Sequence, residues 1–110
     1  MRYEILLAPS AVDDLQRLKA KVRTEVKDAI EKHLRHQPTK LSKSRIKRLR
    51  GLSHPQYRLR VGDVRVFFDV TETTVEVLAI VSKTDAEAWL AEAGTPETDE
   101  GESNEEGGAV

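Results

Sequence analysis

The feature that most constrains this chain is an alternation of apolar and basic residues on both sides of a Gly-Asp pair. The apolar series is Tyr57, Leu59, Val61, Val64, Val66, Phe68 and Val70, and the residues between them include Arg58, Arg60, Arg65 and Phe67. Successive side chains of a strand point to opposite faces. The pattern therefore predicts a β-hairpin that turns at Gly62-Asp63, with one apolar face and one face that carries three arginines.

The other segments predict a small α+β domain. Residues 2–8 alternate as a first strand, and residues 10–18 and 22–34 place apolar side chains three and four apart, as in a pair of helices. Residues 74–81 are nearly all apolar, which is typical of a central strand covered on both faces. We predict a mostly antiparallel sheet, built from an N-terminal strand, a two-helix hairpin, an antiparallel three-strand meander and a C-terminal helix.

Local signals predict where helices begin and end. Ser10 is a candidate N-cap of the first helix. Thr84 and Glu87 have the spacing of a capping box for the last helix, and Gly94 is expected to end it. The stretch 40–56 is basic and only weakly periodic, so we expect mostly loop there, with a short strand or turn around 46–49.

Charge divides the chain into two parts. Basic residues outnumber acidic ones by six up to residue 90, whereas residues 91–110 contain seven acidic residues and no basic one. The last stretch is too polar to offset the entropy cost of ordering it. We predict one folded domain at residues 1–93 and a disordered acidic tail at residues 94–110. This tail either only aids solubility or competes with nucleic acid for the basic surface.

Ten basic residues and no acidic one lie between Lys32 and Arg60, which indicates a phosphate-rich partner. Basic side chains before the hairpin would give a broad electrostatic contact, and aromatic rings near the arginines could stack on nucleobases, although a tryptophan is more often a core anchor. The predicted RNA-contacting residues are Lys43, Lys47, Arg48, Arg50, Phe67 and Trp89.

The hairpin arginines suit one kind of chemistry. A guanidinium matches a phosphate in a planar fork and stays charged, so a cluster of three can bind a phosphodiester and stabilise the charge that develops when it is cleaved. An arginine cannot take up a proton, so a general base would come from elsewhere. The candidates for that role are Lys83, His54, Asp63 and Asp85.

Composition argues against several other chemistries. The chain has no cysteine, so we expect neither disulfides nor thiolate chemistry. His33 and His36 lie three residues apart, which alone is a weak metal signal, and we predict no metal and no cofactor. The amino-terminal uncharged stretch is too short for a signal sequence or a membrane span, so we expect a cytoplasmic protein without a membrane partner.

Two runs of sequence resemble the RelE/ParE superfamily of bacterial toxins from type II toxin–antitoxin pairs, namely LRGLSHPQYRLRVGDVRVFFDV and VEVLAIVSK. The similarity spans about residues 2–90. It implies a single toxin domain that forms a hetero-oligomer with a cognate antitoxin protein. In the RelE branch it also implies action on the ribosome and messenger RNA, which is cleaved by attack of its 2′-hydroxyl on the adjacent phosphate, so that translation is inhibited.

The same resemblance implies roles for individual residues. Arg58, Arg60 and Arg65 would hold the phosphate and stabilise its transition-state charge, and Lys83 would assist the leaving group or the nucleophile.

The chain also departs from the family pattern. Val64 and Trp89 stand where many members have tyrosine, and Ser82-Lys83 replaces a His-Arg pair. Two alternatives therefore stay open. One is a ParE-like toxin that binds DNA gyrase and needs no general base, and the other is an inactive homologue that only binds its antitoxin.

Overall fold

The structure is a computed structural model that describes residues 1–97. In chain order its elements are β1 (Glu4–Leu7), α1 (Pro9–Arg17), α2 (Ala20–Leu34), β2 (Ile46–Arg48), β3 (Leu52–His54), β4 (Tyr57–Val61), β5 (Val64–Val70), β6 (Thr74–Ser82), α3 (Ala86–Ala93) and β7 (Thr95–Pro96). The predicted α+β class and the predicted order of elements are confirmed, and β3 and β7 add to them.

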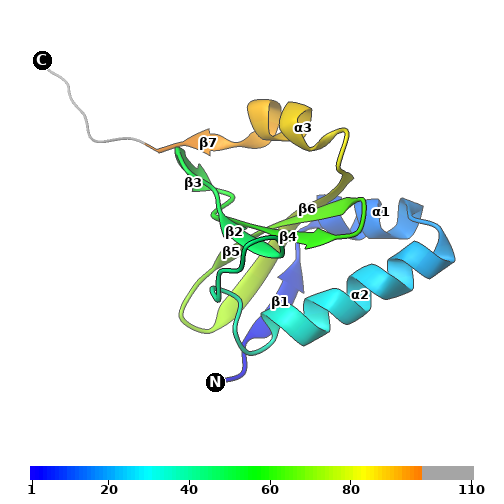
Figure 1. Cartoon of the computed structure of the whole chain (residues 1–110), viewed down its shortest axis with the longest axis horizontal. Coiled ribbons are helices and arrows are strands. Elements are labelled where there is room, and N and C mark those ends of the chain that lie inside the picture. The colour runs from blue at the N-terminus through cyan, green and yellow to red at the C-terminus, as the bar shows by residue number, and fades with distance from the viewer. Residues whose placement is uncertain (98–110) are drawn as a thin grey trace, which may run out of the picture.

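Five strands form one sheet in the order β1-β6-β5-β4-β2. β1 runs parallel to β6 and the other neighbours are antiparallel, so the prediction of a mostly antiparallel sheet is confirmed. α1 and α2 lie on one face of this sheet and α3 on the other (Figure 1). We call these the helical face and the arginine face, because the second one carries Arg58, Arg60 and Arg65.

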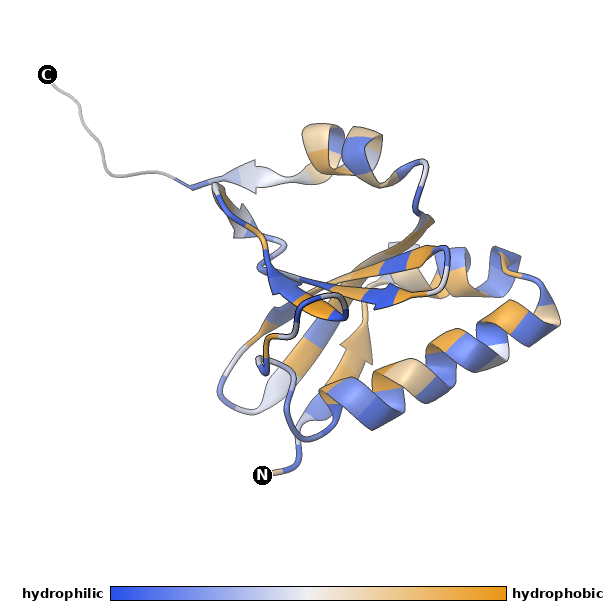
Figure 2. Cartoon of the chain, in the orientation of Figure 1, coloured by the Kyte–Doolittle hydropathy of each residue, from blue (hydrophilic) through white to orange (hydrophobic). Residues whose placement is uncertain are grey.

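The hydrophobic core lies between the helical face and the helices α1 and α2. Val26, Ile30 and Leu34 are spaced four apart on α2 and are all buried. Figure 2 shows α2 hydrophobic on the side toward the sheet and hydrophilic outward. The sheet contributes Ile46, Leu59, Val64, Val66, Phe68, Val75, Val77 and Ile80 to the core. Burying the apolar series of the hairpin on this side directs its arginines to the opposite face.

β4 and β5 form the predicted hairpin. Leu59 lies opposite Val66 and Arg60 lies opposite Arg65, so apolar and basic pairs alternate along the ladder. Gly62 has a φ of 57°, a left-handed conformation that glycine adopts without steric cost. The predicted turn and the predicted division of side chains between the two faces are confirmed.

α1 begins one residue before the predicted N-cap. Pro9 occupies its first turn, where the missing N–H costs no hydrogen bond, and Ala8 is the N-cap. The N-cap prediction for Ser10 is therefore wrong. Ser10 Oγ instead donates to Leu78 O at 2.9 Å. Leu78 is the extra residue of a β-bulge in β6, so its carbonyl needs a partner outside the ladder.

α3 lies on the arginine face and contains no fully buried residue. Its N-cap is Asp85, whose side chain makes no capping bond. The predicted capping box of Thr84 and Glu87 is wrong, because the Thr84 hydroxyl lies 3.1 Å from Ser82 Oγ in the turn after β6. Gly94 ends the helix as predicted.

β3 and β7 form a separate two-stranded sheet that sequence patterns did not predict. β3 falls in the stretch expected to be mostly loop, and β7 falls in the predicted tail. The Glu97 N–H donates to Gly51 O at 2.9 Å, so backbone pairing continues past the predicted domain boundary at residue 93. Residues 98–110, the rest of the predicted disordered tail, lie outside the described residues.

Candidate nucleic-acid interface

The three predicted arginines lie together on the arginine face, toward the turn of the hairpin. Arg60 and Arg65 are directly opposite each other on β4 and β5, and Arg58 is the next residue of β4 on the same face. Like charges at opposite positions destabilise a sheet. Among the described residues, no carboxylate forms an ion pair with any of the three. The cluster therefore holds positive charge that the fold does not neutralise.

Arg58 is half-buried and only partly satisfied by the protein. Its Nη2 donates to Ser44 O at 3.1 Å, but its buried Nε has no hydrogen-bond partner within the part of the chain described. Burial, and then the neighbouring charges of Arg65 and Arg60, lower the pKa of Arg58. A bound anion on this face would offset the repulsion that Arg58 experiences from both neighbours.

Arg60 and Arg65 differ in how firmly they are held. Arg65 Nη1 donates to Gly62 O at 2.8 Å and to Val64 O at 3.1 Å, so this guanidinium lies against the hairpin turn. Arg60 is exposed, and its backbone N–H, which donates to Arg45 O at 2.8 Å, is the group the fold uses. One held and one free guanidinium beside Arg58 can meet phosphate oxygens from different directions.

The two aromatic residues that were predicted to contact RNA, Phe67 and Trp89, stack on each other. Phe67 is fully buried, and its ring stacks on Trp89 of α3 with centroids 4.9 Å apart and planes 9° apart. The buried Phe67 ring has no surface left for a nucleobase, so its role here is to hold α3 on the arginine face. Trp89 is half-buried, because one side of its indole packs on Phe67. The alternative of Trp89 as a packing anchor is therefore the one that the contact favours.

The predicted RNA-contacting residues before the hairpin fall into two groups. Lys47 lies opposite Arg58 in the ladder and so extends the arginine face onto β2. Lys43 and Arg50 are exposed just before and just after β2. Arg48 is different, because its guanidinium lies 5.4 Å from the Tyr57 ring centroid.

Arg48 Nη1 also donates to the carbonyls of Leu49 and Gln56, at 3.0 and 2.8 Å. These bonds hold the segment between β2 and β4. Arg48 is thus brought to the Tyr57 side of the sheet edge and is not part of the arginine cluster.

Lys83 lies at the turn end of the hairpin. Its N–H donates to Asp63 O at 2.7 Å, and Ser82 before it pairs with Val64, next to Arg65. Asp63, Ser82, Lys83 and Thr84 line a shallow pocket there. The structure therefore brings the exposed Lys83 to the same end of the sheet as Arg60 and Arg65.

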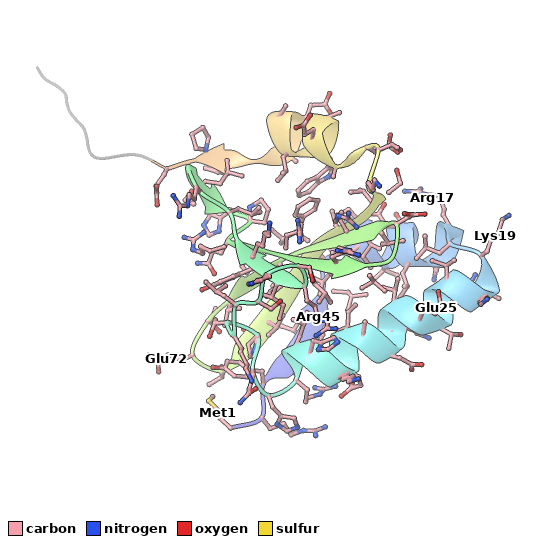
Figure 3. All side chains as sticks on the ribbon, viewed as in Figure 1. Met1, Arg17, Lys19, Glu25, Arg45 and Glu72 are labelled. Atoms are coloured by element: carbon pink, nitrogen blue, oxygen red, sulfur yellow. The ribbon has the colours of Figure 1, made fainter. Side chains whose placement is uncertain are left out.

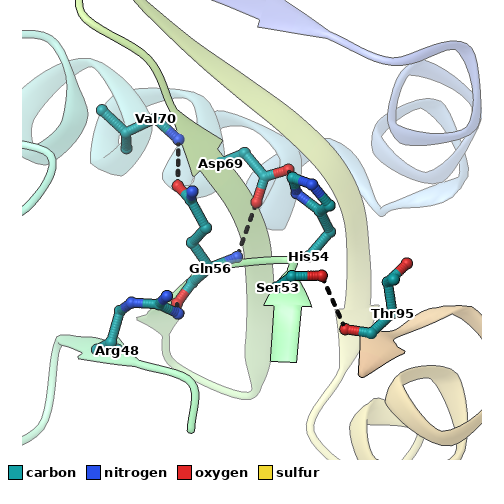
Figure 4. A network of polar contacts seen from close by, with 7 residues as sticks. All are labelled: Arg48, Ser53, His54, Gln56, Asp69, Val70 and Thr95. Carbon is teal, nitrogen blue, oxygen red and sulfur yellow. Dashed lines mark hydrogen bonds and ion pairs between the residues drawn. The ribbon is translucent and has the colours of Figure 1, made fainter. Parts of the chain in front are cut away.

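The other acid–base candidates do not bond to the cluster. His54 Nδ1 lies 2.7 Å from Asp69 Oδ2, and Asp69 Oδ1 accepts the Gln56 N–H at 2.7 Å (Figure 4). These contacts link β3 to β4 and β5 at the end of the hairpin away from its turn. Asp63 lies in the turn and Asp85 caps α3, and neither accepts a hydrogen bond from an arginine of the cluster in the described residues.

Two contacts of the hairpin were missed from the sequence. Asp69 holds His54 at the end away from the turn, and the alternation that puts Asp69 on the face of Arg65 and Phe67 could have indicated it. The Ser44 carbonyl that binds Arg58 leaves no such signal, because any residue in that loop supplies a carbonyl.

The described residues contain no group of three His, Cys, Asp or Glu side chains that could hold a metal ion. Within the same residues, no helix has the length and apolar character needed to cross a membrane.

Comparison with known proteins identifies the class. Residues 5–86 match the family model described as "ParE toxin of type II toxin-antitoxin system, parDE", so the chain belongs to this toxin family. The predicted resemblance to the RelE/ParE superfamily is confirmed, and the chain is a toxin of a type II toxin–antitoxin system. No curated protein matches the sequence.

Solved structures share the fold. A RelE-RelB complex from Pyrococcus horikoshii OT3 matches with a TM-score of 0.62 and 23% identity, over 76% of this chain and 97% of that one. The RelBE2 complex of Mycobacterium tuberculosis matches with a TM-score of 0.62 and 22% identity, over 74% of this chain and 99% of that one. The RelB-RelE complex of Methanococcus jannaschii matches with a TM-score of 0.58 and 24% identity, over 76% of this chain and 96% of that one.

Proposed function

We propose that this toxin is a ribosome-dependent messenger RNA endonuclease that binds the scissile phosphate on its arginine face. The carrying observation is the cluster that half-buried Arg58 forms with Arg60 and Arg65, to which no carboxylate is paired among the described residues. The three like charges repel one another on this face, and a bound anion would offset that repulsion. An RNA phosphodiester is an anion that also supplies its own nucleophile, the adjacent 2′-hydroxyl.

In the proposed reaction the 2′ oxygen bonds to phosphorus while the bond from phosphorus to the 5′ oxygen breaks. The products are a 2′,3′-cyclic phosphate and a free 5′-hydroxyl. Arg58 and Arg60 bind the non-bridging oxygens, and Arg65 adds a third donor from the turn, so that the extra negative charge of the transition state is stabilised. The 2′-hydroxyl proton passes to a base, and the 5′ oxygen takes up a proton as it leaves.

Among the described candidates, Lys83 is the one proposed to assist proton transfer, because it lies at the turn end of the hairpin, two residues after Val81, which pairs with Arg65. The His54–Asp69 pair lies at the other end of the hairpin. The ribosome would supply the remaining acid–base group, which agrees with action in the cytoplasm.

The proposed protein partner is a cognate antitoxin, because the three solved relatives with the shared fold are described as toxin–antitoxin complexes. An acidic antitoxin segment would gain from the uncompensated charge of the arginine face. Covering that face in a toxin–antitoxin hetero-oligomer would keep the toxin inactive.

The decisive experiment is cleavage of messenger RNA by purified toxin on translating ribosomes. Arg60→Ala and Arg65→Ala should each lower the cleavage rate about 100-fold, the usual cost of removing one charge-stabilising donor. Arg17→Ala is the matched control, because Arg17 pairs with Asp14 on the distant helix α1. Intact messenger RNA with the wild-type protein would contradict the nuclease proposal.

A second candidate is a non-enzymatic toxin that binds DNA gyrase. The family model is named after ParE, and no carboxylate or imidazole of residues 1–97 hydrogen-bonds to the arginine cluster. Inhibition of gyrase supercoiling, without messenger RNA cleavage, would support this candidate. Absence of both activities in a protein that still binds its antitoxin would identify an inactive homologue.

A further inference from the structure

A second concentration of positive charge lies in a surface pocket at the carboxyl end of α2. The ionisable side chains that line it are Lys32, His33, His36, Lys40 and Arg45. Figure 3 shows Arg45 beside the carboxyl-terminal turns of α2, and Arg17 and Lys19 at the other end of the helical hairpin. Arg58, Arg60 and Arg65 do not line this pocket, so it is separate from the arginine cluster.

The cations of this pocket have no acidic partners. No carboxylate lines the pocket, and the side chains of Lys32, Lys40 and Arg45 form no ion pair within residues 1–97. Arg35 nearby is different, because it pairs with Glu31 and serves the fold. The carboxyl end of a helix carries about half a negative charge, which three cations exceed.

His33 responds to the same excess of positive charge, and the backbone holds His36 in place. Burial, and then the charges of Arg45 and Lys32, lower the pKa of His33. His36 Nδ1 lies 3.1 Å from Met1 O, and because a carbonyl only accepts, Nδ1 carries the hydrogen. The Met1 carbonyl therefore fixes the orientation of the His36 ring at the pocket.

We propose that this pocket binds a phosphate group. Lys32, Lys40 and Arg45 supply the permanent charge, and His33 supplies a further charged donor when the anion favours its protonated form. The phosphate belongs either to a polynucleotide backbone or to a free nucleotide. Neither source requires that the toxin cleave RNA, so this site stands independently of the proposed function.

The loop that lines the pocket also contacts the arginine face. Arg45 O accepts the Arg60 N–H at 2.8 Å, and Ser44 O accepts from Arg58 at 3.1 Å. The pocket and the cluster thus lie on either side of one loop at the β2 edge. An RNA strand that crosses this edge can place one phosphate in each.

Histidine NMR spectra of the full chain test the proposal directly, because the chain has three histidines and the third is an internal control. His54 is bound to Asp69 on the far side of β2 and should not respond. Titration with inorganic phosphate should shift the ring signals of His33 and His36, and should raise the pKa of His33. Equal shifts of all three histidines, or none at His33, would overturn the proposal.

The same spectra distinguish the two sources of phosphate. Adenosine monophosphate offers a free nucleotide phosphate, and a short oligouridine without terminal phosphates offers only backbone diesters. A response of His33 to either ligand supports the site and identifies its source. A response to neither would overturn it.

Arg45→Gln provides the matched substitution, with Arg17→Gln as its control. Within residues 1–97, Arg45 bonds to the fold through its backbone alone. Its N–H donates to Ser42 Oγ and its carbonyl accepts from the Arg60 N–H, so the variant should fold. Loss of one charged hydrogen bond should weaken phosphate binding about tenfold. It should also reduce the slope of log affinity for single-stranded RNA against log salt by about 0.7. An unchanged phosphate affinity in Arg45→Gln would contradict the assignment, whatever the result of the ribosome assay.

Discussion

Phe67 and Phe68 are neighbours on one strand, and both are fully buried, yet they belong to opposite faces of the sheet. Phe68 packs in the main core and stacks on Tyr57 with ring centroids 5.5 Å apart. Phe67 lies outside that core cluster and stacks on Trp89 of α3, a helix with no fully buried residue. The two rings are therefore equally buried but packed differently. Phe68 lies in the main core, whereas Phe67 packs against a single helix.

This difference between the two faces of the sheet indicates which face can carry functional residues. The helical face needs its apolar series to hold α1 and α2, so its residues are committed to stability. The arginine face is covered only in part, and its arginines repel one another without improving the packing. The second face is thus free to carry charge that serves a ligand.

The largest expected effect comes from truncating each ring in turn. Phe68→Ala should cost about 3–5 kcal/mol of unfolding free energy, because the rigid core cannot collapse into the cavity. Phe67→Ala should cost only about 1.5–3 kcal/mol, close to the transfer free energy alone, because α3 can move. Urea denaturation of both variants measures the difference. Equal losses, or the reverse order, would show that α3 is as firmly packed as the helical hairpin.

Trp89→Ala sharpens the same comparison from the other partner. Loss of the stack should cost about 1–2 kcal/mol, including about 0.5–1.5 kcal/mol for the aromatic pair itself. The effect should be local, so amide hydrogen exchange should speed up in residues 86–96 and stay slow in β4, β5 and β6. Faster exchange throughout the sheet would mean that α3 and the core open together.

Much of this fold follows from the sequence, because the hairpin and α2 carry strong periods. Alternation assigned Leu59 and Arg60 to opposite faces, and spacing by four assigned Val26 and Ile30 to the core. The candidate arginine cluster follows from the same alternation. These elements share one cause, since burial of one face fixes the direction of the other.

The remaining features depend on contacts between distant segments. The Leu78 bulge is satisfied by Ser10, and β3 pairs with β7 some forty residues later, as the Leu52 to Pro96 register shows. The local spacing of apolar residues in the sequence does not indicate such contacts. The Thr84 capping box failed for a related reason, because a competing hydroxyl at Ser82 lay within reach.

Arg60→Thr tests whether the arginine face carries charge at the expense of stability. Arg60 lies opposite Arg65, so removing its charge and adding a β-branched side chain should raise the unfolding free energy by about 0.5 kcal/mol at low salt. Much of the gain should disappear at high salt, where the repulsion is screened. The same substitution should impair RNA cleavage. A loss of stability instead would show that Arg60 has a structural partner.

The smallest effect concerns His33, whose pKa is lowered in the folded protein by burial and by the charges of Arg45 and Lys32. As the pH falls, His33 takes up a proton in the unfolded chain before it does so in the folded chain. The folded state should therefore lose stability as the pH drops through the ordinary histidine range. The loss should level off once the pH is below the folded-state pKa. His33→Gln should reduce this pH dependence of the melting temperature between about pH 7.5 and 5. Added phosphate should reduce this pH dependence in the wild type but not in His33→Gln, because the anion stabilises the protonated His33 ring. A pH profile that His33→Gln leaves unchanged would mean that His33 titrates alike in the folded and unfolded chains.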